Sequence, residues 1–264
     1  MRLIALETAT DACSAALWID GELRWLLESR AARRHGELIL EQVDRLLAEA
    51  ELRPGQLDGV AVGRGPGAFT GVRLGLGVAQ GLAFAIDRQV VPVSTLAVLA
   101  QQGLERGAWQ VLALLDARMG ELYWAEFETG ADGRIGVAKE FLSSPEGVTP
   151  SWAAASGGRS ALERRIEPVV GATGASRIRQ ADRLALGSGL AAYPDLALRW
   201  GLDETEMDPA AQPCAREVAI LGAAAFARGE SVSPELAQPV YLRDRVAEPR
   251  PTPGTSVGMV GGKP

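Results

Sequence analysis

The chain has 264 residues and a mass of 27.8 kDa, with 47% hydrophobic and 23% charged residues. This balance is typical of a globular protein with a real core, and no uninterrupted apolar stretch approaches the length that spans a bilayer. The net charge of −6 argues against a wide basic face for a phosphate backbone, so we expect another subunit to hold most of any nucleic acid.

The first hundred residues predict the element order βββαβα. Three strands open the chain with a tight hairpin turn at Asp20-Gly21, and a helical period begins at Gly36. Ser94 stands where the third helix needs an N-cap. The expected strands are 3–6, 14–19, 23–27, 57–62 and 89–93, and the expected helices are 36–50, 71–86 and 94–102.

The same order begins again after residue 107. Strands are expected at 111–116, 122–127, 135–141 and 184–186, and helices at 161–165 and 215–227, while residues 144–159 show neither period cleanly. Residues 246–264 are rich in Pro and Gly and lack the apolar residues of a core. The sequence therefore predicts an α/β protein with two tandem lobes, at 1–103 and 104–243, followed by a disordered tail at 244–264.

The strongest local motif is the glycine-rich loop at residues 63–73, which lies between an expected strand and an expected helix. N–H groups at a helix N-terminus can hold an anion, and the polar bends near residues 8–11 and 116–120 would face each other across a cleft. A purely structural turn is the alternative for these motifs, because Gly, Asp, Ser and Thr are ordinary turn residues. The candidate nucleotide- or anion-binding residues are Thr8, Thr10, Asp11, Gly65, Gly67, Arg73 and Arg118.

The residue inventory argues against chemistry at a metal or a catalytic triad. His35 is the only histidine, and the two cysteines, Cys13 and Cys214, lie far apart in apolar surroundings. No Gly-x-Ser-x-Gly motif accompanies the histidine. We therefore expect no catalytic residue, no metal and no cofactor of the chain's own. Because the chain turns acidic at Glu7, too early for a signal peptide, we expect a cytoplasmic protein without membrane attachment.

The helix expected at residues 71–86 is apolar on nearly all sides. One side packs on its own sheet, and the remaining apolar surface calls for cover by the first helix or by another chain. Gly77 and Gly81 have no side chain to hold a neighbouring helix away. Helix packing inside the lobe is the alternative. The candidate partner-interface residues are Leu38, Gln42, Arg73, Leu74, Gly77, Val78, Gln80, Gly81 and Phe84.

Five segments resemble the bacterial TsaB family: LIALETATDACSAALW, GRGPGAFTGVRLGLGVAQGLA, VPVSTLAVLAQ, LLDARMGELYWAEF and PVYLRD. The resemblance implies an actin-like (ASKHA) fold and a part in making threonylcarbamoyladenosine beside the anticodon of tRNAs. It implies binding to the catalytic relative TsaD, and through that complex to TsaE, with only indirect contact to tRNA. TsaD-like sequences hold a metal with a His-x-x-x-His pair, where this chain has Thr95 and Leu99.

Two hypotheses follow from these observations. In the first, the chain is a non-catalytic scaffold that binds TsaD as a heterodimer and forms a homodimer when alone. In the second, it is an independent actin-like ATPase or kinase, with Glu7, Asp11 and Asp116 as candidate carboxylates for Mg²⁺. Related proteins have been described as glycoproteases, but the residues give no support for proteolysis.

Overall fold

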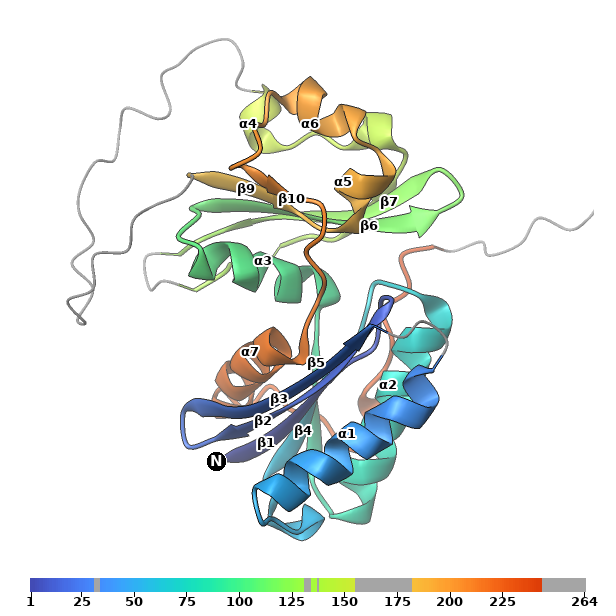
Figure 1. The fold of residues 1–264 in the computed structure, drawn as a ribbon, viewed down its shortest axis with the longest axis vertical. Helices are drawn as coiled ribbons and strands as arrows, with labels where there is room; N and C mark the ends of the chain where they lie inside the picture. Colours follow the sequence, from blue (N-terminus) through green and yellow to red (C-terminus); the bar gives the residue numbers. More distant parts are fainter. Residues whose placement is uncertain (31–33, 131–133, 137, 155–181, 244–264) are drawn as a thin grey trace, which may run out of the picture.

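The structure is a computed structural model that describes residues 1–30, 34–130, 134–136, 138–154 and 182–243. It contains two five-stranded mixed sheets, each covered by helices on both faces (Figure 1). The two-lobed α/β architecture predicted from the sequence is therefore confirmed. The helix expected at 161–165 and the tail at 244–264 lie outside the described residues. No helix of the described part is both long and apolar enough to cross a membrane.

The first sheet has the strand order β3-β2-β1-β4-β5. β1 pairs antiparallel with β2 and parallel with β4, because the hairpin at Asp20-Gly21 returns the chain directly while α1 carries it across the sheet. Ser94 caps α3 by accepting the Ala97 N–H at 3.1 Å, as the sequence predicts. The elements are β1 (Arg2–Glu7), β2 (Ala12–Ile19), β3 (Glu22–Arg30), α1 (His35–Glu49), β4 (Gly59–Gly63), α2 (Phe69–Ala85), β5 (Gln89–Val93) and α3 (Thr95–Glu105).

The second sheet repeats this topology with the order β10-β9-β6-β7-β8. Its first strand again lies in the centre, with an antiparallel partner on one side and a parallel partner on the other, so the predicted duplication is confirmed. The elements are β6 (Gln110–Arg118), β7 (Glu121–Glu128), β8 (Phe141–Ser143), α4 (Ser151–Ala154), β9 (Arg183–Leu186), α5 (Ser188–Ala192), α6 (Asp195–Trp200), β10 (Met207–Asp208) and α7 (Ala215–Ala227). The part of the chain that the structure describes also holds three 3-10 helices, η1 (Pro54–Gln56), η2 (Pro145–Gly147) and η4 (Pro234–Leu236).

The strand predicted at residues 135–141 is wrong. Only Phe141–Ser143 pairs with β7, and the described residues before it make no more than an isolated bridge at Ile135. Glu140 instead forms an ion pair with Arg64 of the first lobe, with Oε1 at 3.1 Å from the guanidinium. The side chain that the alternating pattern assigns to a strand therefore belongs to a contact between the lobes.

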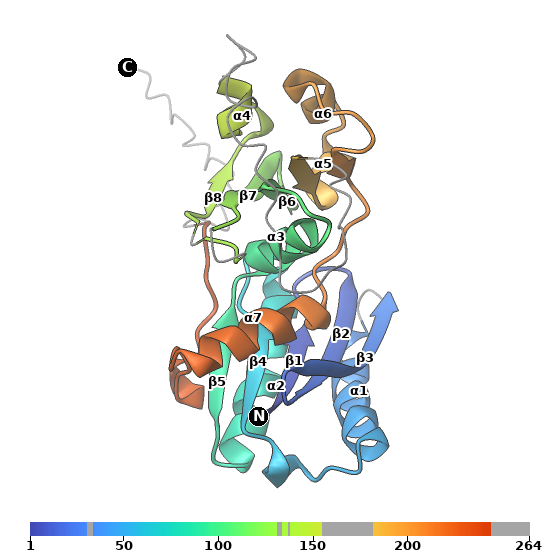
Figure 2. The ribbon, with the colours of Figure 1, turned by 90° about the vertical axis from the view of Figure 1, so that its left-hand side faces the viewer.

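The helices α3 and α7 exchange lobes relative to their chain order. α3, which follows the first sheet, buries Leu96 and Leu99 against the second sheet, and α7, which follows the second sheet, buries Val218 and Ala219 against the first. α1 and α2 cover the other face of the first sheet, and α5 and α6 cover the outer face of the second. α7 and α3 therefore lie between the two sheets (Figure 1 and Figure 2).

Candidate functional site

The glycine-rich loop between β4 and α2 packs on the bend between β1 and β2. The Ala68 N–H donates to the Ala9 carbonyl at 2.7 Å, and the Thr8 hydroxyl donates to the Gly71 carbonyl at 2.8 Å. A Cβ at Gly67 would lie 2.5 Å from the Ala9 oxygen, and one at Gly71 would lie 2.1 Å from the Thr8 oxygen. The structure thus gives these glycines a packing role, in which two backbones approach more closely than any side chain allows.

The other residues predicted to hold an anion lie in three places: Thr10 and Asp11 on the β1–β2 bend, Gly65 in the loop itself, and Arg118 in the second lobe. Thr10 accepts a 3.4 Å hydrogen bond from the Ala12 N–H, and Asp11 is exposed. Arg118 lies in the second lobe, where its guanidinium pairs with Asp116 at 3.0 Å. Gly65 has φ +91° and turns the loop in a conformation that favours glycine. Turn geometry and a local ion pair therefore account for these side chains.

Glu7, the last residue of β1, is a carboxylic acid buried in the first lobe. Its side chain is fully buried, one carboxylate oxygen accepts the Ala9 N–H at 2.7 Å, and the other has no hydrogen-bond partner. Burial raises the pKa of Glu7 to about 7, although backbone N–H groups of Ala9 and Thr8 oppose the shift. Burial, with a smaller contribution from Glu7, also raises the pKa of the Cys13 thiol to about 11. Glu7 therefore keeps its proton to a higher pH than an ordinary carboxyl group does.

The junction after β5 does not fit the metal site of TsaD-like sequences. Thr95 and Leu99 are both fully buried, and Leu99 belongs to the core between α3 and the second sheet. Neither side chain offers an imidazole, and Leu99 offers no ligand atom. Within the described ranges, no group of three His, Cys, Asp or Glu side chains is arranged to hold a metal ion.

One row of residues on α2 faces away from the lobe. We call Phe69, Arg73, Gly77, Gly81 and Phe84 the α2 outer row; each is exposed, and the ring of Phe84 is 80% exposed. A Cβ built at Gly77 or Gly81 would meet no atom within 4 Å. These glycines therefore serve no packing purpose within the described chain, and they leave the helix backbone open to a neighbour.

The other residues predicted for this interface divide into two groups. Leu38, Leu74 and Val78 are half-buried in or beside the seam between α1 and α2, and Gln80 donates to the Ala237 carbonyl at 3.0 Å. Gln42 does not reach the surface. Its side chain is buried and donates to the Cys13 carbonyl at 3.4 Å, because its position on α1 faces β2 and not solvent.

Arg73 is held in an aromatic cluster that the sequence prediction missed. Its guanidinium lies 3.8 Å from the centre of the Phe69 ring, and its Nε donates to the Tyr241 hydroxyl at 2.5 Å. The rings of Phe69 and Tyr241 are 5.6 Å apart. Arg73 and Tyr241 are separated by 168 positions, so no local pattern could pair them. The only signal was the PVYLRD segment near the end of the chain.

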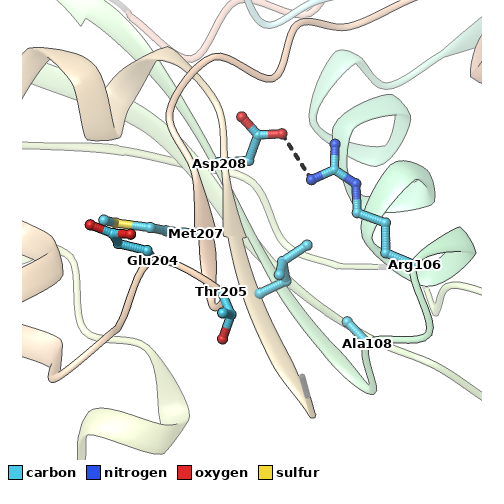
Figure 3. A pocket seen from close by; sticks show the side chains of 7 residues that line it. Arg106, Ala108, Glu204, Thr205, Met207 and Asp208 are labelled. Atoms are coloured by element: carbon cyan, nitrogen blue, oxygen red, sulfur yellow. Dashed lines mark ion pairs between the residues drawn. The ribbon is translucent and has the colours of Figure 1, made fainter. Parts of the chain in front are cut away.

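A pocket of about 240 Å³ opens at the edge of the second sheet, away from every residue predicted for a site (Figure 3). Two of its charged residues, Arg106 and Asp208, pair with each other at 2.8 Å. Glu204 and Thr205 line the pocket across from Arg106. Because its lining includes none of the residues of the predicted motifs, we place no site there.

Comparisons with known proteins agree on one family. Residues 28–250 match the family model described as TsaD, tRNA N6-adenosine threonylcarbamoyltransferase. The chain is 36% identical over 249 residues to the tRNA threonylcarbamoyladenosine biosynthesis protein TsaB of Escherichia coli strain K12, covering 94% of this chain and 96% of that protein. It is 34% identical to the TsaB protein of Haemophilus influenzae, covering 93% and 95% of the two chains.

Solved structures point the same way. A Pseudomonas aeruginosa protein described as uncharacterized, with similarity to peptidase YEAZ, is 38% identical with a TM-score of 0.75, covering 92% of this chain and 99% of that one. YeaZ from the same organism is 35% identical with a TM-score of 0.72, covering 91% and 99%. The two lobes of equal topology fit the actin-like fold expected from the resemblance. The chain therefore belongs to the TsaB family, whose members are related to the threonylcarbamoyltransferase TsaD.

Proposed function

We propose that this chain is a non-catalytic subunit in the biosynthesis of threonylcarbamoyladenosine on tRNA, and that it acts by binding TsaD through the α2 outer row. The observation that carries the proposal is the exposed, apolar and glycine-bearing face of α2. TsaE would join through the TsaB–TsaD complex, and tRNA would be contacted only indirectly. Indirect contact with tRNA agrees with the net charge of −6, since an acidic protein binds a phosphate backbone poorly.

The chemistry of the α2 outer row favours a helical partner. Gly77 and Gly81 lie one turn apart on an open face, so a second helix can approach the backbone closely, while Phe84 offers a large ring for burial. Among the described residues no carboxylate pairs with Arg73, and a partner would therefore satisfy it with an acidic or carbonyl oxygen. The TsaD family model matches a range that includes α1 and α2, so the partner has equivalent helices to offer.

Binding measurements with full-length chain and full-length TsaD test this proposal. We expect Gly77→Glu and Gly81→Glu each to weaken binding about a hundredfold, because a bulky charged side chain would fill the space in which the partner helix approaches the backbone of α2. The control is Leu198→Glu on α6, whose side chain is 84% exposed on the second lobe, and it should bind as the wild type does. Isothermal titration calorimetry gives each Kd. Wild-type affinity in both glycine variants would refute the proposal.

The proposal also assigns the chain a homodimer in the absence of TsaD. Each chain carries the same apolar face, and a twofold axis can bring two such faces together. Light scattering after size exclusion should give the dimer mass for the wild type and a monomer for Gly77→Glu. A wild-type monomer at micromolar concentration would argue against self-association through α2.

We propose that the chain needs no nucleotide or other cofactor of its own. Supporting this, the loop that would cradle a phosphate is packed against Thr8 and Ala9, and Arg118 pairs with Asp116. Calorimetry with Mg²⁺ and ATP should show no binding at micromolar concentrations and no turnover. Micromolar binding with release of phosphate would favour the independent ATPase or kinase instead.

A further inference from the structure

The last described segment of the chain runs along α2. Beyond the exposed turn after α7, Val90 and Val232 exchange two backbone hydrogen bonds at the edge of the first sheet, at 2.8 and 2.9 Å. Residues 234–243, which we call the C-terminal strap, then pass beside α2 toward the second lobe (Figure 1). The Ala237 carbonyl accepts the Gln80 side chain, and the Val240 N–H donates to the Arg64 carbonyl at 3.0 Å.

The strap is anchored at both ends of the helix. Ala237 is fully buried in the core beneath α2, near the C-terminal half of that helix. Tyr241 contacts Phe69 and Arg73 in the first two turns. Arg243 then crosses to the second lobe, where it donates to Glu121 at 2.5 Å and to the Ala117 carbonyl at 3.2 Å. These contacts hold the strap beside the α2 outer row.

Two apolar side chains of the strap nevertheless remain open to solvent. Leu236 is 65% exposed and Tyr241 is 45% exposed, although Ala237 between them is fully buried. Leu236 belongs to η4, which packs on α2, and Tyr241 extends the ring of Phe69. An ordered segment that turns such groups outward beside an exposed apolar helix makes one continuous apolar surface with it.

We propose that the C-terminal strap is part of the docking surface, so that the partner which covers the α2 outer row also covers Leu236 and Tyr241. This inference rests on the proposed function, and its occupant is the same helical lobe of the TsaD partner. Continuity carries the argument, because Tyr241 already shares Arg73 and Phe69 with α2. A helix seated on Gly77 and Gly81 lies with α1 on one flank and the strap on the other.

Affinity measurements between the full chain and full-length TsaD test the strap separately from α2. We expect Leu236→Glu and Tyr241→Ala each to weaken binding about tenfold, as apolar contacts beside an interface centre do. Leu198→Glu should leave the affinity within about twofold of the wild type. Thermal unfolding of each variant checks folding. If Tyr241→Ala disturbs Arg73, Leu236→Glu still decides the question, because Leu236 lies in η4 and its aliphatic side chain has no part in the Arg73 cluster.

The outcomes separate the two proposals. Wild-type affinity in both strap variants, together with lost binding in Gly77→Glu, would overturn the strap inference and leave docking through α2 intact. Wild-type affinity in Gly77→Glu as well would overturn docking through α2 itself. Strap variants that weaken the homodimer while leaving TsaD binding unchanged would show that a second copy is the occupant, which also overturns the inference.

Discussion

Replacing Gly71 with alanine is expected to lower the free energy of unfolding by about 3 kcal/mol or more, because overpacking here meets backbone atoms. A Cβ would lie 2.1 Å from the backbone carbonyl oxygen of Thr8. The side-chain hydroxyl of the same threonine donates a hydrogen bond to the Gly71 carbonyl. The β1–β2 bend and the start of α2 would have to move apart together. Urea unfolding followed by circular dichroism measures the loss.

Gly77→Ala is the matched control, since Gly77 belongs to the same helix but faces open space. There alanine should raise the free energy of unfolding by up to about 1 kcal/mol through its higher helix propensity. Equal stabilities of the two variants would show that the Thr8 contact opens without cost.

Gly75 gives a third member of this series. Its Cβ would lie 2.4 Å from the Thr8 hydroxyl oxygen, a side-chain atom that Thr8→Ala removes. Thr8→Ala should therefore relieve part of the cost of Gly75→Ala but little of the cost of Gly71→Ala.

The stability of the protein is expected to fall as the pH rises through the pKa of Glu7. Burial raises this pKa from its ordinary value of 4.5 to about 7, so the folded state holds the proton more tightly than the unfolded state does. The stabilising effect of that proton is fully present below about pH 4.5 and is lost as the pH passes about 7. The whole change amounts to about 3 kcal/mol.

Glu7→Gln isolates this effect, because glutamine keeps an acceptor for the Ala9 N–H and carries no proton that titrates in this range. Urea unfolding at several pH values from 5 to 8.5 should show the wild type losing stability relative to the variant as the pH rises. The pKa of Glu217 is also raised by burial, but Glu217 is present in both proteins and cancels in the difference. Parallel stability curves would contradict the assignment.

The order of strands and helices was predictable because short stretches of sequence mark where each element begins and ends. Hairpin turns, the change from a two-residue to a helical period and the Ser94 cap all act over a few residues, and the structure follows them. Residues 135–141 show the limit of this reasoning. Their alternation resembles a strand, but the Glu140 carboxylate is bound by Arg64, which lies 76 positions earlier.

The candidate surfaces were predictable to different degrees. The open face at Gly77 and Gly81 follows from the shortage of polar residues on one helix. Gln42 could not be placed by the same reasoning, because its polar type suggests exposure while its position on α1 faces β2, where its side chain donates to the Cys13 carbonyl. The strap and its aromatic cluster depend on contacts across more than 150 positions, which periodicity cannot detect.

The exchange of α3 and α7 has a consequence for how the molecule can be divided. A cut after residue 107, between α3 and β6, would leave α3 on the fragment whose sheet it does not cover, and α7 on the other fragment in the same way. Each half would expose a bare apolar sheet face, including Ala5 and Ala61 in one and Leu115 in the other. The halves are therefore expected to need each other to reach a soluble form, because each one carries the helix that covers the other's sheet.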